Sequence, residues 1–382
     1  VYTPGETQHV NGPLFFLPRA KDATVKGIFD RADLSDRSLL MLGTNGRGGM
    51  LRAFVSWGEL SSRYDALLAA NIDCEIPEDR WIMFTRCRAW LVFQGYSQEI
   101  CDDCFVSFYS NSGSKGIWRF QIPTGQGQHV FLSVYVEMIS GENCLRMIFS
   151  REPAKGRNGR LPDHEPVRLI LRPDIENRNF HDTIKAYQGP EHTWQDAIDS
   201  KPDGFNFSPN QKHQLNLRIS DGDFVWEPEW QYMVHRPKEA ERGLDPDSDL
   251  FSPGYFQTFL TGDGSVTLNA RVGEGKTPDP EIIMPSIKDS EPFTFEKNKL
   301  LAPVDVLEKA MDHYTVNRAA LHTVIAGYPW FLDWGRDALI FVRGLVAAGK
   351  TDEARDIIKL FGQYETDGTI PNMIQGENAR NR

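Results

Sequence analysis

The sequence lacks the features that mark membrane-spanning, disulfide-stapled and nucleic-acid-binding proteins. It has no run of ~18 apolar residues, so no transmembrane helix is expected. Five cysteines in 382 residues do not suggest a disulfide framework, and this low content favours a reducing, cytoplasmic location. Positive charge is not in excess, because the formal net charge is -11 at pH 7. This balance argues against a nucleic-acid or anionic-membrane partner and is compatible with a neutral substrate.

Patterns for metal binding, phosphate binding and secretion are equally sparse. Cys101 and Cys104 form a C-x-x-C pair, but a zinc site needs a second pair, so we expect no metal and no other cofactor. The glycines of Asn45–Gly49 lack the Gly-Lys-[Ser/Thr] ending of a phosphate loop and predict a tight turn. Val1–Pro18 lacks the basic start and apolar core of a signal peptide. Because the chain begins with Val in place of Met, earlier removal of a signal peptide remains an alternative.

Residues 1–273 have the pattern of a large antiparallel β-sandwich. Short runs rich in β-branched and aromatic residues are separated by turn signals, and no helical segment is evident between them. In one run the apolar residues alternate with period 2. Residues 182–250, rich in Trp, Pro and acidic residues, are interpreted as irregular loops that decorate the sandwich. The alternating apolar residues are Val130, Leu132, Val134, Val136 and Met138.

Residues 274–300 have the Gly, Pro and charged composition of a linker, and helical patterns follow from 301 to 382. The first predicted helix begins near Pro303 and runs to about Asn317. A second covers 337–348, and a third starts after Thr351, a good N-cap. The apolar face of the first helix is predicted from Val304, Leu307, Met311 and Tyr314.

The stretch Ala326–Asp337 gathers four aromatic residues, two carboxylates and an arginine at a predicted helix start. Asp337 can cap that helix, where the helix N-terminus favours its charged form and aromatic surroundings favour its neutral form. A glycosidase needs one carboxylic acid kept protonated to donate to the leaving oxygen. Trp330 and Trp334 could form a flat floor for a sugar ring, and Arg336 could hold hydroxyl groups. An ordinary helix cap beside core aromatic residues is the alternative interpretation.

Four segments, in order along the chain, resemble the glycogen debranching enzyme (amylo-α-1,6-glucosidase) family. Ala326–Asp337 is similar to that family's A-G-x-x-W-F-x-D-W-G-R-D signature. Residues 44–49 resemble that family's T-N-G-x-G-G segment. Residues 62–68 resemble its R-R-Y-H-G-L-L segment, but Ser62 stands where Arg is usual and Asp65 where His is common. Residues 241–254 resemble its E-R-G-L-D and D-L-x-x-P-G pair, and 367–372 resemble its G-x-I-P-N loop.

This resemblance implies a β-sandwich followed by the beginning of an (α/α) toroid of six helical hairpins, of which 301–382 would form an incomplete N-terminal part. It implies removal of α-1,6-linked glucose from glycogen, or from another α-glucan, with inversion. Asp337 resembles the general acid. The residues implied to contact substrate are Trp330, Asp333, Trp334, Arg336, Asn372 and Glu377.

An inverting enzyme also needs a carboxylate ~6.5–9.5 Å from the acid to activate water. Glu365 and Glu377 have the right side-chain type, but the resemblance implies a glutamate further along, outside these 382 residues. A related toroid glucosidase with another linkage preference, or a non-catalytic carbohydrate-binding or structural fragment, remain alternatives. No sequence feature defines an oligomeric state.

Overall fold

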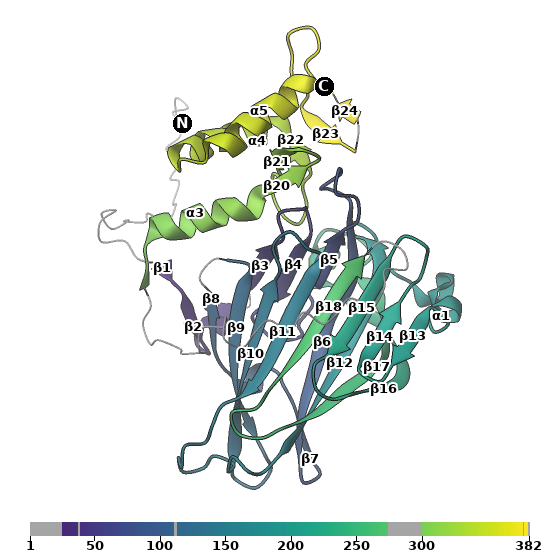
Figure 1. Cartoon of the computed structure of the whole chain (residues 1–382). Coiled ribbons are helices and arrows are strands. Elements are labelled where there is room, and N and C mark those ends of the chain that lie inside the picture. The colour runs from purple at the N-terminus through teal and green to yellow at the C-terminus, as the bar shows by residue number, and fades with distance from the viewer. Residues whose placement is uncertain (1–24, 37–38, 111–112, 274–299, 377, 381–382) are drawn as a thin grey trace, which may run out of the picture.

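A computed structural model describes residues 25–36, 39–110, 113–273, 300–376 and 378–380. Two large antiparallel sheets pack face to face, and three helices gather beyond one end of them (Figure 1). The predicted β-sandwich is therefore confirmed. The predicted linker at 274–300 lies outside the described residues except for Leu300. None of the described helices is both long enough and apolar enough to cross a membrane.

The first sheet has nine strands within the described residues. Their spatial order is β13, β14, β15, β18, β11, β10, β9, β8, β2, and every neighbouring pair is antiparallel. The strands are β2 (Ile28–Asp30), β8 (Phe105–Ser110), β9 (Lys115–Pro123), β10 (His129–Met138), β11 (Cys144–Arg151), β13 (Ile198–Lys201), β14 (Gly204–Phe207), β15 (Gln214–Ile219) and β18 (Ser265–Gly273).

The second sheet has eight strands within the described residues. The order β16, β17, β12, β6, β5, β4, β3 is again antiparallel throughout, and β7 pairs with β6. The strands are β3 (Leu40–Thr44), β4 (Met50–Phe54), β5 (Ala66–Asn71), β6 (Arg80–Phe93), β7 (Tyr96–Glu99), β12 (Val167–Asn179), β16 (Asp223–His235) and β17 (Asp247–Leu260).

Short helical turns decorate the sandwich, and the remaining elements form the C-terminal unit. The turns are η1 (Asp33–Asp36), η2 (Asp102–Cys104), η3 (Ala186–Gln188), α1 (Pro190–Thr193) and α2 (Pro237–Glu241). The C-terminal unit, residues 301–380, contains α3 (Pro303–Tyr314), β20 (Thr315–Arg318), β21 (Leu321–Val324), β22 (Asp333–Trp334), α4 (Gly335–Ala347), α5 (Thr351–Gln363), β23 (Met373–Gln375) and β24 (Asn378–Arg380); β1 (Val25–Lys26) pairs with β19 (Leu300–Leu301).

The sandwich core lies between the two sheets because each strand turns alternate apolar residues inward. The period-2 prediction for β10 is confirmed, since all five of its alternating residues are buried. Phe120 and Phe149 from the first sheet join Phe84 and Phe256 from the second in one continuous apolar cluster. Burial of such rings supplies most of the favourable free energy of a sandwich.

Two parts of the sequence interpretation are wrong. Residues 182–250 are not mainly loops, because four strands (β13 to β16) run through 198–235 and extend both sheets. The first helix ends at Tyr314, and its predicted apolar face is only half buried: Val304 and Leu307 are 62% and 64% exposed. Only Met311 and Tyr314 of that face pack against the cluster between α4 and α5.

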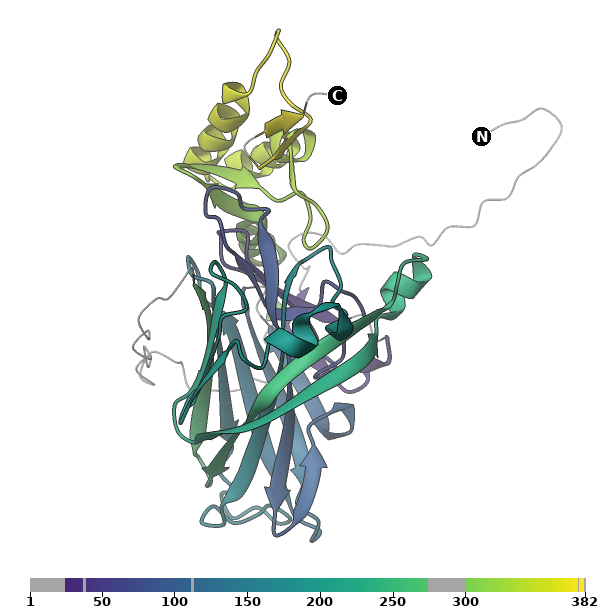
Figure 2. The same ribbon diagram turned by 90° about the vertical axis from the view of Figure 1, so that its right-hand side faces the viewer.

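The C-terminal unit sits on one end of the sandwich, as both views show (Figures 1 and 2), and α3 contacts β3 there. A shared apolar cluster joins the two parts. It contains Met50, Tyr64, Ala66, Ala69, Ile82 and Phe180 from the sandwich, and Val316, Ile325 and Tyr328 from the C-terminal unit. The composition boundary near residue 300 is therefore bridged by a common core.

Replacing a core ring should cost far more stability than replacing an exposed ring of the same type. Phe120 is fully buried, so we expect Phe120→Ala to lower the free energy of unfolding by about 3–5 kcal/mol. Phe259 is 64% exposed, so Phe259→Ala should change it by no more than about 0.5 kcal/mol. Urea denaturation of both variants is the measurement, and equal losses would contradict this assignment of the core.

Candidate active site

Asp337 lies in the first turn of α4, directly after the short strand β22. It is the third helical residue, so it does not cap the helix as the sequence predicted; Trp334 occupies the cap position. The side chains of Asp337 and Arg336 are 42% and 73% exposed, and Arg336 Nη2 lies 3.8 Å from Asp337 Oδ2. The helix N-terminus and this guanidinium both place positive charge beside a carboxylate that faces solvent.

A glycine makes the abrupt change from strand to helix at this point feasible. A Cβ on Gly335 would lie 2.4 Å from the carbonyl oxygen of Pro371 and 3.1 Å from the Phe361 ring. The Gly335 amide donates to the carbonyl oxygen of Asn372 at 2.9 Å. The start of α4 is thus packed against the 371–372 segment, and Trp334 pairs with Met373 on β23.

Asp333, four residues before Asp337, is completely buried in a polar network. Thr323 Oγ1 donates to Asp333 Oδ1 at 2.7 Å, and Arg318 Nη1 lies 3.5 Å from Oδ2. The same Arg318 nitrogen lies closer, at 2.9 Å, to Oε2 of Glu78 from the sandwich. Glu78 Oε1 accepts from the Gly376 amide at 2.6 Å, and Arg318 also donates to the Gly376 carbonyl. In this structure the Asp333 carboxyl group is not accessible to a ligand.

Burial raises the pKa of Asp333 to about 7, and the negative charge of Glu78 adds to this rise. The hydrogen bond from Thr323 and the charge of Arg318 act in the opposite direction. Arg318 does not cancel the effect of burial, because it lies closer to Glu78. Oδ2 of Asp333 has no hydrogen-bond partner among the described residues, which is consistent with a carboxyl group that holds its proton.

Trp330 lies on the loop between β21 and β22, and this loop is attached to the sandwich. Arg80 is fully buried, and its Nη2 donates to the carbonyl oxygens of Pro329 and Phe331 at 3.2 and 3.1 Å. The side chains of Trp330 and Phe331 remain 41% and 50% exposed. The Asn372 side chain is also exposed, whereas Glu377 lies outside the described residues.

The sequence analysis missed the sandwich residues that hold this site. Glu78 lies in the turn before β6, and Arg80 is the first residue of β6. Neither carries a local motif, so only their burial identifies them. The sequence analysis found that 44–49 resembles a segment of the family but assigned it no functional role. In the structure this segment contacts α3 and β20. Thr44 Oγ1 lies 3.2 Å from Nδ1 of His313, and the Gly46 carbonyl accepts from the Asn317 amide at 2.8 Å.

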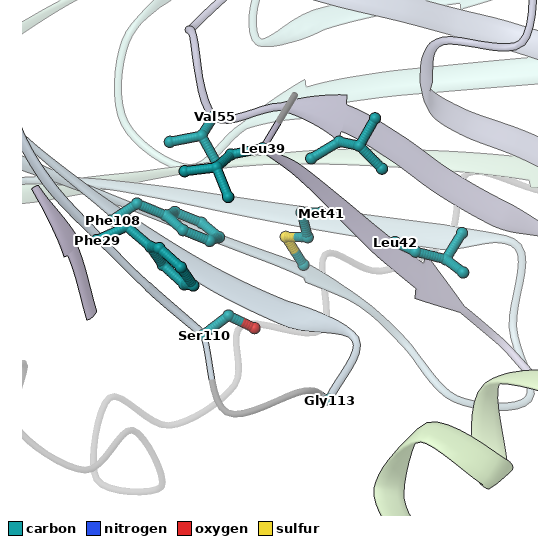
Figure 3. Close-up of a pocket in the computed structure, with 9 residues that line it drawn as sticks. Phe29, Leu39, Met41, Leu42, Val55, Phe108, Ser110 and Gly113 are labelled. Carbon is teal, nitrogen blue, oxygen red and sulfur yellow. The ribbon is translucent and has the colours of Figure 1, made fainter. Parts of the chain in front are cut away.

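A pocket of about 190 Å³ in the sandwich is not part of this site (Figure 3). Its walls are mainly apolar, and β2, β3 and β8 contribute Phe29, Met41 and Phe108. A sugar needs several convergent hydrogen-bonding groups, which this lining does not offer. Within the described ranges, no group of three or more His, Cys, Asp or Glu side chains is arranged to hold a metal ion.

Comparison with known families agrees with the motif. A family model described as glycogen debranching enzyme N terminal matches residues 40–267, and one described as amylo-alpha-1,6-glucosidase matches residues 306–382. The first match alone covers more than half of the chain. The protein therefore belongs to the glycogen debranching enzyme family, and the resemblance inferred from the sequence is confirmed.

Similarity to individual proteins is weaker. No match was found among curated proteins. A bacterial glucoamylase in complex with acarbose is 12% identical with a TM-score of 0.42. The match covers 95% of this chain and 53% of the glucoamylase. A polysaccharide lyase is 12% identical with a TM-score of 0.26, and the match covers 63% of this chain and 33% of the lyase. A heparinase III is 8% identical with a TM-score of 0.25, and the match covers 43% of this chain and 20% of the heparinase. This chain spans about half the length of the glucoamylase, and likeness of this degree supports no functional conclusion.

The buried carboxyl group predicts a specific pH dependence of stability. The folded protein holds the Asp333 proton to about pH 7, whereas an unfolded chain releases it near pH ~3.9. The stabilising contribution is complete below the unfolded pKa and is lost as pH rises through 7. Asp333→Asn cannot lose a proton, so its stability relative to the parent should rise between about pH 4.5 and about pH 8.

Urea denaturation of both proteins across this range measures the difference. Asp352→Asn serves as the control, because it makes the same substitution at a side chain that is 84% exposed in the first turn of α5. The change with pH in Asp333→Asn should exceed any change in this control. Parallel profiles for Asp333→Asn and the parent would mean that Asp333 is ionised throughout, contrary to the pKa assigned here.

Proposed function

We propose that the protein acts in the hydrolysis of α-1,6-linked glucose at glycogen branch points, by a single displacement with inversion. Asp337 is the general acid in this proposal. Membership of the glycogen debranching enzyme family supports the reaction class. The substrate is an uncharged α-glucan, which is compatible with the net charge of -11. Glycogen, the partner in this proposal, is a cytoplasmic polymer, and we propose the same compartment for the protein.

One observation carries the choice of acid: the two carboxylates of the D-W-G-R-D motif have opposite environments. Asp333 is completely buried and bonded within the protein, whereas the side chain of Asp337 is 42% exposed at the start of α4. A general acid must come within hydrogen-bonding distance of the oxygen that it protonates. The exposure of Asp337 supports its choice as the acid, and the burial of Asp333 supports a role in fixing the position of β22 and therefore of Asp337.

The proposed reaction transfers one proton at each end of the displacement. Asp337 donates its proton to the glycosidic oxygen as the bond from C1 to that oxygen breaks. A water molecule attacks C1 from the opposite face and gives its proton to a second carboxylate, which leaves glucose with inverted configuration. We propose that this second carboxylate is a glutamate outside these 382 residues. Glu365 is exposed and accepts a hydrogen bond from Gly368 in its own turn.

The remaining motif residues are proposed to hold the sugar, because several are exposed near the start of α4. Arg336 is 73% exposed and can donate to hydroxyl groups, while Trp334 is half-buried and can offer part of its ring. Asn372 is exposed on the segment that packs against Gly335, and Trp330 is exposed on the preceding loop. Glu377 retains its proposed contact on the strength of the family resemblance. For Asp333 we propose a positioning role in place of direct contact.

Glucose release from a glycogen limit dextrin tests this proposal. We would compare the 382-residue chain with a version extended at its C-terminus, each with and without Asp337→Asn. We expect release by the extended version, and a fall in kcat of about 10²–10⁴-fold when the acid is replaced, because general acid catalysis contributes on that scale.

Asp352→Asn is the matched control, since it replaces a carboxyl group in the first turn of α5. It should leave kcat unchanged. Undiminished activity in Asp337→Asn would reject Asp337 as the acid. Equal activity in the two lengths of chain would place the second carboxylate within residues 1–382 and reject our assignment of the base.

A further inference from the structure

The ring of Trp330 is held in place by the sandwich. Its centroid lies 6.5 Å from that of Tyr64 in an edge-to-face arrangement at 83°. The Arg242 guanidinium lies over the Trp330 ring, 5.7 Å from the centroid. Arg80 fixes the backbone on both sides of the tryptophan. An aromatic ring that is 41% exposed and already ordered can bind a flat ligand with little loss of side-chain entropy.

His181 provides a hydrogen-bonding group next to this ring. The Tyr64 hydroxyl group lies 3.1 Å from His181 Nδ1, and the His181 ring lies 3.9 Å from that of Phe180. Burial, together with the charges of Arg80 and Arg63, lowers the pKa of His181, so the imidazole is neutral at pH 7. Because Tyr64 engages Nδ1, the second nitrogen of this exposed residue is the polar atom available to a ligand.

A buried carboxylate positions the arginines of the same surface. Glu239 is fully buried and accepts hydrogen bonds from Ser62 Oγ at 3.1 Å and from the Arg63 amide at 3.0 Å. Its Oε1 also lies 3.6 Å from Arg63 Nε and 3.9 Å from Arg242 Nη1. The Arg242 side chain is 44% exposed. One carboxylate therefore offsets part of the charge of these two guanidinium groups, and the exposed Arg242 side chain can present N–H groups to uncharged acceptors.

We propose that Trp330, Tyr64, His181 and Arg242 form an α-glucan subsite at the junction of the sandwich and the C-terminal unit. Trp330 provides a ring face for a glucose unit, while His181 and Arg242 bind hydroxyl groups and Tyr64 orients the histidine. This inference rests on the proposed function, because it takes the same class of substrate. It gives a binding role to residues within 62–68 and 241–254, two of the segments that resemble the family and to which the sequence analysis assigned no chemistry.

Calorimetric titration of the 382-residue chain with maltohexaose and with a branched glycogen limit dextrin tests the subsite. Trp330→Ala should raise the Kd by about tenfold or more, as expected for an anchoring aromatic residue. Trp226→Ala is the matched control, because Trp226 is 43% exposed against 41% for Trp330 and lies on the edge strand β16. It should leave the Kd unchanged. His181→Ala alters an exposed residue and should also weaken binding, whereas His181→Gln should restore part of it.

Three results would overturn the inference: no binding by the parent chain, equal loss in Trp226→Ala and Trp330→Ala, or unchanged binding in Trp330→Ala. Binding of a sulfated oligosaccharide but not of maltohexaose would also overturn it, because the surface would then select anions. These titrations need no catalysis. Loss of binding in Trp330→Ala without glucose release by the extended protein would keep the subsite and reject the hydrolase. Glucose release by the extended protein, with binding that does not depend on Trp330, would keep the hydrolase and reject the subsite.

Discussion

The buried guanidinium of Arg318 is the constraint on which the geometry of the candidate site depends. It lies between Glu78 of the sandwich and Asp333 of the D-W-G-R-D motif, and it also donates to Gly376 beyond β23. A charge taken out of water costs several kcal/mol unless its partners are in place. Displacing the segment of Glu78 would leave the charge of Arg318 uncompensated in the interior, and displacing Gly376 would remove one of its hydrogen-bond acceptors. The start of α4 is therefore fixed relative to the sandwich by electrostatics as well as by apolar packing.

The sequence predicted the sandwich well where one side of a strand is buried and the other is not. Alternation in β10 marks its inward face, because a period of 2 is the geometric signature of a strand. The same signal failed in β16, where Trp226 and Tyr232 are exposed on an edge strand and two register shifts interrupt the alternation. Pro and acidic residues there resemble a loop, because an edge strand tolerates them.

The sequence identified the motif that resembles the family, but it did not identify the residues that surround this motif in the structure. A helix start next to two carboxylates can be recognised locally, but burial depends on contacts with residues far away in the chain. Asp333 and Asp337 look equivalent in sequence, and only the complete burial of Asp333, with a smaller effect of the nearby Glu78, raises the pKa of the first. Likewise, nothing in the sequence around His181 indicates that it lies beside Tyr64, 117 residues earlier. Long-range pairings of this kind have no local periodicity.

The apolar cluster that contains Tyr64, Ile82, Val316 and Tyr328 joins the sandwich and the C-terminal unit into one packed core. Composition divides the chain near residue 300, yet this cluster draws its members from both sides of that division. A sandwich produced alone would present the apolar floor of the cluster to water, and the C-terminal unit alone would lose the other half of its packing. The two parts should therefore melt together in a single calorimetric transition, and the cooperative unit is larger than either segment that the composition defines.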